Sequence, residues 1–427
     1  MALTGEIVVE DMSDAERALS QRVEDVLPAL RASAQAVDIG GAFNLEHVKT
    51  LSEAGLLGLV VPKHYGGLGG GLRDLCAATF AMGSACPSTA MAFFFHCSSS
   101  SRGLLALEAL ESGLFTPEEA PIVRAFAEKV LYTMGRDRMW LANFASESVK
   151  SEKAAITIST KAKPVDGGYL INGVKSFGSA TGVADRYLVT AALDDGSVGA
   201  NIDGASLATF MMSRDTKGVR ERTKWDAVGM RGSATHGLIL EDVFVPSEDA
   251  LAIRGAFTRS MQMSRGSFVG NQLASTAVYA GATWNVYNST IEALRAKSFA
   301  DTGNSIGAST LHQTLVGEMM VDLETALLWL RRQLFLETCE PPLKSKSEVV
   351  QMWRLCKGTI AESGFQVAVK ALKCMGTAGT ANGGTQARAL RDMAMGLVQA
   401  FPAERGRLMA AQMELEGAEQ AQFGIDN

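Results

Sequence analysis

Apolar residues recur at helical spacing along the first third of the chain. Leu19, Val23 and Leu30 fall on one face of the first periodic segment. Pro62 and the run of glycines after it exclude regular structure between two of the periodic segments. One later segment is apolar on every face, which is typical of a buried helix. The hydrophobic pattern therefore predicts helices over residues 13–38, 45–54, 72–95 (the all-apolar segment) and 102–135.

Between Trp140 and Pro246 the pattern changes to short alternating runs rich in β-branched residues. The last run follows a stiff Gly-Met-Arg-Gly turn and ends at Pro246, which has no backbone N–H to donate to a neighbouring strand. Turns are expected at Asp166-Gly167-Gly168, Asn172-Gly173 and Asp194-Asp195-Gly196. We expect strands within residues 155–162, 169–175, 187–193, 208–212 and 238–245, forming an antiparallel barrel or sandwich.

After Pro246 the helical period returns and continues almost to the end of the chain. Long periodic segments joined by short pieces rich in helix breakers predict an antiparallel bundle of four helices. Those segments are 258–297, 309–338, 346–374 and 385–415. The fold class is therefore α+β, with an N-terminal helical domain, a middle antiparallel β-domain and a C-terminal four-helix bundle. The expected domain boundaries are 1–139, 140–250 and 251–427.

Composition narrows the function classes. The net charge of −6 gives no reason to expect nucleic acid or an anionic membrane as a partner. No window is long and apolar enough for a membrane span, and no secretory signal is evident at the start, so a cytoplasmic protein is expected. The six cysteines and five histidines are scattered without metal-ligand spacing, so we expect neither disulfides nor a metal site.

Four local motifs occur in the order found in one known family. Residues 53–69 (EAGLLGLVVPKHYGGLG) resemble its amino-terminal signature, and residues 169–181 (YLINGVKSFGSAT) resemble its flavin-side strand. Residues 229–246 are similar to the exit of its β-domain, and residues 375–392 resemble its glycine turn and Arg-Asp pair. The order of helices, strands and helices agrees too. The chain therefore resembles the acyl-CoA dehydrogenase superfamily, including its two-component flavin monooxygenase branch.

The resemblance implies a flavin, FAD or alternatively FMN, between the β-domain and the bundle. It also implies a homo-oligomer, a dimer or tetramer, whose neighbouring subunits share the dinucleotide. An aromatic face next to small hydroxyl residues suits a flavin ring, although Phe177 could equally be a core residue and the serines could be ordinary strand-end hydroxyls. The glycines could be helix caps. The residues assigned to the cofactor by resemblance are Phe144, Ser146, Phe177, Ser179, Gln313, Gly376 and Gly379.

The catalytic base of the dehydrogenases is missing from both of its usual positions. Counting from the Arg-Asp pair places Ala400 where the glutamate is expected, and the alternative position, before Arg265, is occupied by Ser264. Neither side chain is a useful base at neutral pH. Two other carboxylates could serve: Glu404, four residues after Ala400, and Glu147, near the expected flavin. The first could instead be solvated beside neighbouring arginines, and the second could be structural. Phe94, Arg265 and Ala400 are the expected substrate-side residues.

The loop that usually fixes thioester phosphates also differs. Lys150 and Lys153 stand there instead, and they could hold a phosphate or form a solvated loop. The monooxygenase branch needs no α-proton base. It needs a hydroxyl near the reactive edge of the flavin, for which Ser179 is the candidate, and it often has a pocket histidine, for which His96 is the candidate. A satisfied core histidine is the alternative for His96.

Three hypotheses follow from the sequence. The favoured one is a flavin monooxygenase of a small organic or thioester substrate, with a flavin reductase as partner. The second is an acyl-CoA or acyl-carrier dehydrogenase with an atypical base, such as Glu404 or Glu147, and an electron-transfer partner. The third is a non-catalytic or partner-dependent subunit that keeps the fold.

Overall fold

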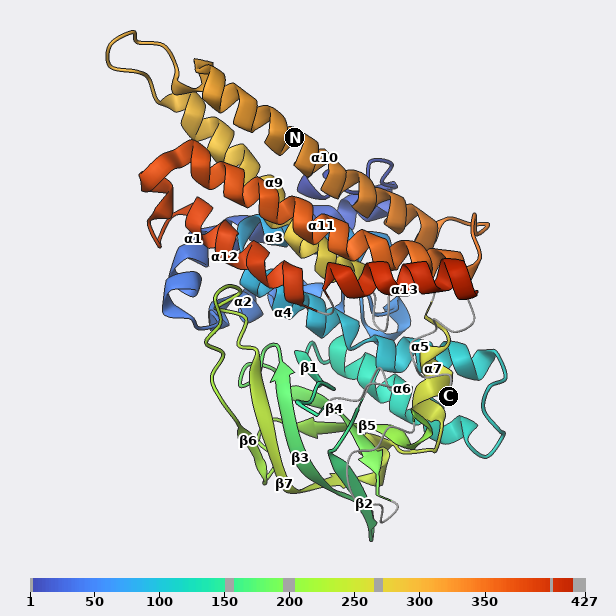
Figure 1. Ribbon diagram of the computed structural model, residues 1–427. Coiled ribbons are helices and arrows are strands. Elements are labelled where there is room, and N and C mark those ends of the chain that lie inside the picture. Colours follow the sequence, from blue (N-terminus) through green and yellow to red (C-terminus); the bar gives the residue numbers. More distant parts are fainter. Residues whose placement is uncertain (1–2, 150–156, 195–203, 265–271, 400–401, 418–427) are drawn as a thin grey trace.

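The computed structural model describes residues 3–149, 157–194, 204–264, 272–399 and 402–417 (Figure 1). The first part of the chain is helical, as predicted, but the apolar segment 72–95 forms two helices instead of one. Cys86 has extended backbone angles and Pro87 opens the second helix, because proline disfavours helical angles in the residue before it. The helices are α1 (Asp14–Gly40), α2 (Leu45–Glu53), α3 (Leu72–Ala85), α4 (Pro87–Ser98), α5 (Ser101–Glu111) and α6 (Ala120–Met134).

A single sheet follows, with strand order β6-β7-β3-β2-β4-β5-β8, and β1 pairs with β4 off this path. Most pairings are antiparallel, but β1 and β2 each pair with β4 in parallel, which the expectation of an antiparallel domain did not include. The turn expected at Asn172-Gly173 is also wrong, because both residues lie inside β3 at a register shift against β7. The strands are β1 (Leu141–Phe144), β2 (Lys161–Val165), β3 (Gly168–Gly178), β4 (Arg186–Leu193), β5 (Leu207–Ser213), β6 (Val219–Glu221), β7 (His236–Pro246) and β8 (Ala250–Leu251).

The last part of the chain is helical again, and α9, α10, α11 and α12 pack on one another as a bundle. The segment predicted as 385–415 ends its first helix at Val398 and resumes after Pro402. The predicted 309–338 and 346–374 are confirmed to within one residue. The helices are α7 (Ala256–Met261), α9 (Leu273–Ala296), α10 (Thr310–Thr338), α11 (Lys346–Met375), α12 (Thr385–Val398) and α13 (Ala403–Glu416).

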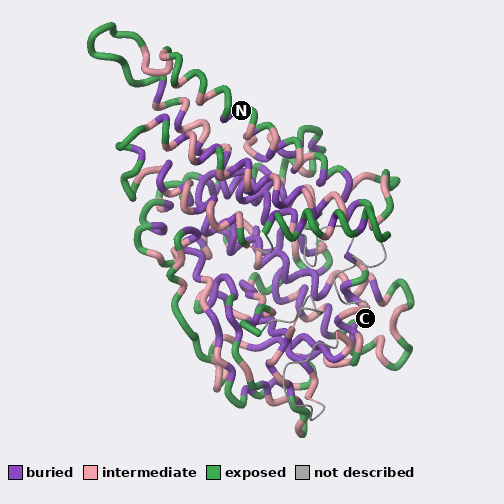
Figure 2. The backbone as a smooth tube through the Cα atoms, in the orientation of Figure 1, coloured by how far each residue is buried: buried purple, intermediate pink, exposed green. Residues whose placement is uncertain are grey.

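Buried residues concentrate where α3 and α9 cross and inside the sheet domain (Figure 2). Two glycines allow the two helices to approach at backbone distance. A Cβ at Gly83 would lie 2.4 Å from the carbonyl oxygen of Val278, and one at Gly281 would lie 2.0 Å from that of Phe80. The N-terminal helices and the bundle therefore share one core, and the predicted fold class is confirmed.

The segment from Gly229 to Gly232 ties the three parts of the chain together. The N–H of Met230 donates to Asp392 of α12 at 2.7 Å, and the Nε of Arg231 donates to the carbonyl of Asp38 in α1 at 2.9 Å. A Cβ at Gly229 would lie 2.1 Å from the carbonyl oxygen of Arg391, so only glycine fits there without displacing the chain. This turn is one of the places where the sheet domain is fixed against both helical parts.

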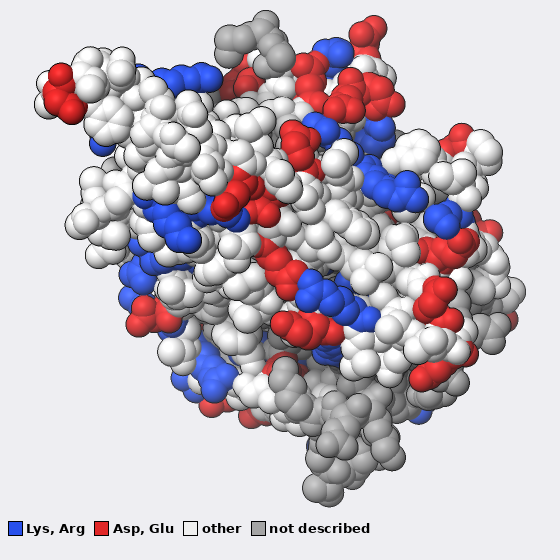
Figure 3. Space-filling view, turned by 45° about the horizontal axis from the view of Figure 1, so that its top comes forward, with Lys and Arg blue, Asp and Glu red and all other residues white. Residues whose placement is uncertain are grey.

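Within the described residues, no helix combines the length and apolar character needed to cross a membrane, and no cluster of His, Cys, Asp and Glu has the makings of a metal site. On the face drawn in Figure 3, basic and acidic side chains are interspersed, with no large field of one sign. This surface gives no electrostatic reason to expect a polyanionic partner.

Candidate functional site

The end of β3 carries the two residues that the sequence placed nearest the flavin ring. Phe177 is 53% exposed, which is unusual for a phenylalanine on a sheet, and its ring packs edge-on against Trp225 at 5.7 Å between centroids. Ser179 is buried, and its hydroxyl lies 2.9 Å from that of Thr235, which lies 2.7 Å from that of Ser233. The segment thus combines an open aromatic surface with a chain of three hydroxyls.

The neighbouring end of β1 presents backbone and hydroxyl groups. Ser146 is exposed, and its carbonyl accepts the N–H of Ser176 at 2.9 Å. The hydroxyls of Ser148 and Ser176 are also 2.9 Å apart. Phe144, by contrast, is fully buried against Tyr187, 4.8 Å between ring centroids. Its ring supports the sheet and offers no exposed face to a cofactor in this arrangement.

Glu147 is saturated with hydrogen-bond donors. It accepts from the Nζ of Lys175 at 2.6 Å, from the N–H of Ser159 at 2.6 Å and from the hydroxyl of Thr160 at 2.6 Å. The Ser159 hydroxyl and the Thr160 N–H donate to it as well. Although burial opposes ionisation, these donors and the Lys175 charge hold its pKa below the usual value. A carboxylate bound in this way is a structural anion and a poor proton acceptor.

His96 is fully buried at the end of α4 with both ring nitrogens occupied. Its Nε2 donates to the carbonyl of Leu57 at 2.7 Å, and its Nδ1 accepts the N–H of Leu141 at 2.9 Å. Burial lowers its pKa to about 4, so the ring stays neutral. The imidazole joins a loop of the helical domain to β1, and in this arrangement neither nitrogen is left for a substrate.

On the bundle side, the residues next to position 400 form a polar cluster that the sequence did not predict. The hydroxyl of Tyr279 donates to Gln399, and the amide of Gln399 donates to the Sδ of Met91 at 3.3 Å. Burial raises the pKa of Tyr279, so the phenol remains a donor. Ala400 and Arg265 lie outside the described residues. Tyr279, which lies 120 residues before Gln399 in the chain, carries no local sequence signal, because only packing brings it to Gln399.

Asp392, the acid of the Arg-Asp pair, is fully buried beneath this region. Burial raises its pKa to about 6, against the opposing effect of the hydrogen bond from Met230. Its partner Arg391 pairs with Asp38 of α1. Both residues of the pair are thus engaged in holding the three parts of the chain together.

The other predicted site residues lie on helices, away from β3 in the chain. Phe94 is buried and packs edge-on against Phe95 at 4.9 Å between centroids. Glu404 is exposed on α13 and lines a cavity of about 280 Å³ between α11, α12 and α13. Gln313 is exposed in the first turn of α10. The glycine pair lies at the end of α11, where Gly376 has a φ of 58° and Gly379 is buried.

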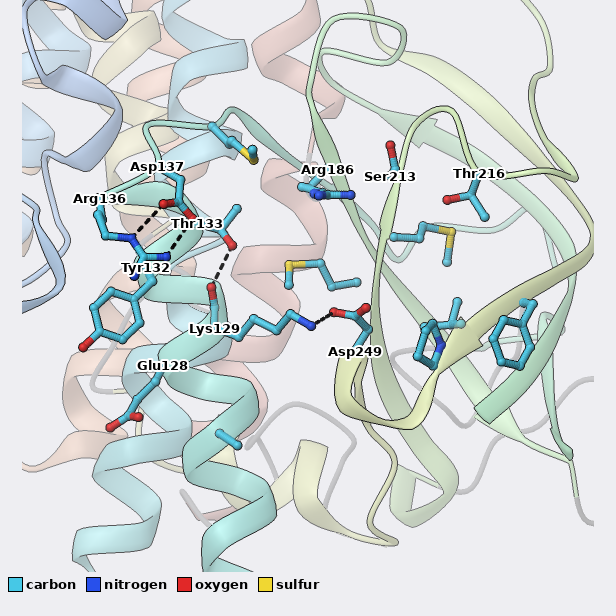
Figure 4. Close-up of a pocket in the computed structure, with 17 residues that line it drawn as sticks. Glu128, Lys129, Tyr132, Thr133, Arg136, Asp137, Arg186, Ser213, Thr216 and Asp249 are labelled. Carbon is cyan, nitrogen blue, oxygen red and sulfur yellow. Dashed lines mark hydrogen bonds and ion pairs between the residues drawn. The ribbon is translucent and has the colours of Figure 1, made fainter. Parts of the chain in front are cut away.

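A larger cavity, of about 560 Å³, separates α6 from the sheet (Figure 4). Lys129 of α6 crosses it to pair with Asp249 at 2.5 Å, and Arg136 pairs with Asp137 at 2.8 Å. Figure 4 shows Glu128 and Tyr132 pointing away from the sheet. None of the predicted site residues lines this cavity, so it is distinct from the candidate flavin site.

Comparison with known proteins agrees with the sequence motifs. Residues 13–107 match the family model "Acyl-CoA dehydrogenase, N-terminal domain", and residues 143–243 match "Acyl-CoA dehydrogenase, middle domain". The mitochondrial isovaleryl-CoA dehydrogenase of Arabidopsis thaliana is 25% identical over 364 residues, 84% of this chain and 81% of its own. The L-evernosamine nitrososynthase of Micromonospora is 28% identical over 273 residues, 63% of this chain and 59% of its own.

Solved structures share the fold. KijD3, in a complex with FMN and dTDP-3-amino-2,3,6-trideoxy-4-keto-3-methyl-D-glucose, aligns with a TM-score of 0.78 at 22% identity. The alignment covers 99% of this chain and 98% of that one. The chain belongs to the acyl-CoA dehydrogenase superfamily of flavin-dependent oxidoreductases. Within it, the relatives include both acyl-CoA dehydrogenases and flavin-dependent N-oxygenating enzymes.

The residues at the end of β3 fit a flavin. A half-exposed phenylalanine is costly to leave in water, and a flat aromatic ring laid on it would remove that surface from solvent. The hydroxyl of Ser179 is a short donor on the same strand end, and its neighbours Thr235 and Ser233 can each pass on a hydrogen bond. Phe177, Ser179 and Ser146 are therefore the residues that would hold the ring.

Proposed function

We propose that this protein is a flavin-dependent monooxygenase that oxidises a small organic substrate. The observation that carries the proposal is the state of Glu147. This carboxylate follows β1, beside the candidate flavin site, and five donors hold it as a fixed anion. Together with the alanine at position 400 and the serine at 264, this leaves the usual positions of the base for α-proton removal without a proton acceptor.

Oxygenation makes different demands on the protein. When bound and reduced, the flavin supplies the activation of oxygen. The chain supplies a surface for the ring at Phe177 and a hydroxyl at Ser179 that can donate toward its reactive edge. The neutral Tyr279 hydroxyl and the Gln399 amide could orient a polar group of the substrate without removing its proton.

The test follows the reoxidation of reduced FMN after mixing with oxygen, with and without the protein. A monooxygenase should delay full reoxidation relative to free FMN, and Ser179→Ala should shorten that delay at least tenfold. Ser213→Ala, on β5 beside the other cavity, is the matched control and should behave as the unaltered protein does. Reoxidation at the rate of free FMN, despite bound flavin, would exclude oxygenase chemistry.

The competing proposal is an acyl-thioester dehydrogenase that uses Glu404. One observation favours it: Glu404 lines a cavity instead of pairing with its neighbour Arg407, which pairs with Glu362. Anaerobic titration separates the two proposals. A dehydrogenase would be bleached by an acyl-CoA, and Glu404→Gln would abolish the bleaching, whereas a monooxygenase would keep its oxidised spectrum.

A homo-oligomer and an external source of reduced flavin complete the proposal. The outer face of α10 exposes Val321, Leu328 and Phe335 at seven-residue intervals, each more than half exposed. An apolar seam with this spacing suits a helix of a second subunit. Leu328→Glu should therefore lower the mass measured by light scattering to that of a smaller species, and an unchanged mass would place the interface elsewhere.

A further inference from the structure

Arg102 is a buried charged side chain that has no counter-ion among the residues that the structure describes. It is the second residue of α5, and only 5% of its surface is exposed. Its Nη1 contacts the Sδ of Met261 at 3.4 Å, and its guanidinium carbon lies 4.8 Å from the centre of the Phe257 ring. In the part of the chain that the structure describes, Nε meets no acceptor and no carboxylate pairs with the group.

These contacts are too weak to account for the burial of a full positive charge. A thioether sulfur is a weak acceptor, and a cation–π contact offsets only part of the cost of removing a guanidinium from water. Burial acts unopposed on this group, since no neighbouring charge contributes to its lowered pKa of about 10. Buried charges in proteins are normally paired, so a partner that arrives with a ligand would supply what is missing.

The unpaired edge of the guanidinium selects the chemistry of that partner. Nη1 faces Met261 and one face of the group lies against Phe257, which leaves the edge formed by Nε and Nη2. This edge binds a carboxylate or a phosphate through two parallel N–H···O bonds, a geometry that a neutral carbonyl or a hydroxyl cannot reproduce.

Arg102 also lies where the three parts of the chain meet. α5 belongs to the N-terminal helices and α7 begins the C-terminal part, and Phe257 packs in one cluster with Ile158 and Leu207 of the sheet domain. Ligand sites concentrate at such junctions. Ser99 and Ser100 keep right-handed helical angles between α4 and α5, so Arg102 continues the helical run of α4.

At its other end, this helical run of α4 and α5 contacts the polar cluster of Tyr279 and Gln399. Met91, which lies eleven positions before Arg102 and therefore roughly 16 Å away along this helical run, accepts the amide of Gln399. We propose that Arg102 binds the oxyanion of the organic substrate, a carboxylate or a phosphate, and so restricts the enzyme to anionic substrates. The identity of the ligand as the substrate rests on the proposed function, whereas the binding itself requires no turnover.

The experiment is titration calorimetry of the full chain loaded with FMN, using acetate, inorganic phosphate and coenzyme A as separate probes. The first two distinguish carboxylate from phosphate, and the third presents phosphate on an organic carrier. Arg102→Met removes the charge at similar volume, Arg102→Lys keeps the charge without the two-bond edge, and Arg31→Met is the control at an exposed arginine of α1.

We expect at least one probe to bind the unaltered protein and the Arg31→Met control equally well. Arg102→Met should bind it at least tenfold more weakly, with Arg102→Lys between the two, and the ligand-free Arg102→Met protein should melt at the same temperature or higher. Equal affinity in Arg102→Met, or no binding of any probe to the unaltered protein, would overturn the proposal. If the unaltered protein binds a probe in this way but does not delay the reoxidation of FMN, the oxygenase function is refuted and the anion site is still supported.

Discussion

The buried ion pair between Glu147 and Lys175 offers the sharpest test of how the sheet domain is stabilised. The exposed fraction of the Lys175 side chain is 0% and that of Glu147 is 1%, so neither charge can be solvated in place. In Glu147→Gln, the amide oxygen can still accept from Lys175 beside the carbonyl of Thr190, but the negative charge is gone and the amide NH2 faces the donors of Ser159. The substitution is nearly isosteric, so its effect reports charge and hydrogen bonding instead of packing.

The expected loss of unfolding free energy depends on which charges and donors remain buried after each substitution. Removing one partner of a buried ion pair costs roughly 3–5 kcal/mol, because the other charge is left uncompensated. Lys175→Met should cost less, since the Glu147 carboxylate keeps its four donors from Ser159 and Thr160. The double variant Glu147→Gln/Lys175→Met should recover most of the loss, because it removes both charges together.

The pH dependence of this stability deficit tests the same argument independently. Burial lowers the pKa of Lys175 from 10.5 to about 8, so the unfolded chain binds a proton that the folded chain releases between these values. Because Glu147 raises the pKa of Lys175, the variant should release this proton at a lower pH than the unaltered protein does. Its stability deficit should therefore narrow as the pH rises toward 8 and stay level from pH 8 to 10.5. Urea denaturation followed by tryptophan fluorescence measures both quantities. A deficit of less than about 1 kcal/mol at pH 7, set against the penalty above, would refute the uncompensated-charge argument.

Three further predictions concern other parts of the chain. Asp392→Asn should remove a pH dependence of stability. The folded pKa of Asp392 is raised from 3.8 to about 6, so this group stabilises the protein below pH 3.8 and loses that contribution as the pH rises through 6. Urea midpoints measured across pH 4–7 should therefore vary less with pH in the variant than in the unaltered protein. Gly229→Ala should lose about 1–3 kcal/mol of unfolding free energy, because the new methyl group would overpack against Arg391. Gly317→Ala, which has open space around it in α10, should gain up to about 1 kcal/mol. Equal effects of the two substitutions would contradict the close packing of the turn against α12. Phe177→Ala should weaken FMN binding about tenfold in a fluorescence titration without lowering thermal stability, and Phe244→Ala, a similarly exposed phenylalanine on β7, should leave the FMN affinity unchanged.

The features that the sequence predicted best are those that local patterns carry. The helical periods of α10 and α11 and the alternation in β4 and β5 each mark a single element, and each appears close to its predicted place. The division of 72–95 was readable in principle, because Pro87 stands in the middle of the apolar run. The uninterrupted hydrophobic period outweighed it, although a proline at the first turn opens a new helix as easily as it disturbs an old one.

The residues that the sequence missed depend on packing between distant segments. Lys175 has the pattern of one more polar position of a strand, and nothing near it indicates that its amine is buried against the carboxylate of Glu147. Arg102 follows a run of serines and looks exposed until α7 covers it. Tyr279 and Gln399 are separated by 120 residues of chain and meet only through the crossing of α9 with α12. A pattern along one segment cannot report such pairs.

The turn from Gly229 to Gly232 has a consequence for how the molecule comes apart. Asp392 finds its backbone donor in the sheet domain, and Arg391 and Arg231 both contact Asp38 of the N-terminal helices. Separating any two of the three parts of the chain would expose a buried carboxylate to solvent or leave an arginine without its acceptor. The three architectural regions should therefore unfold in one cooperative transition, and substrates must enter by local movement of side chains or loops instead of by separation of whole domains.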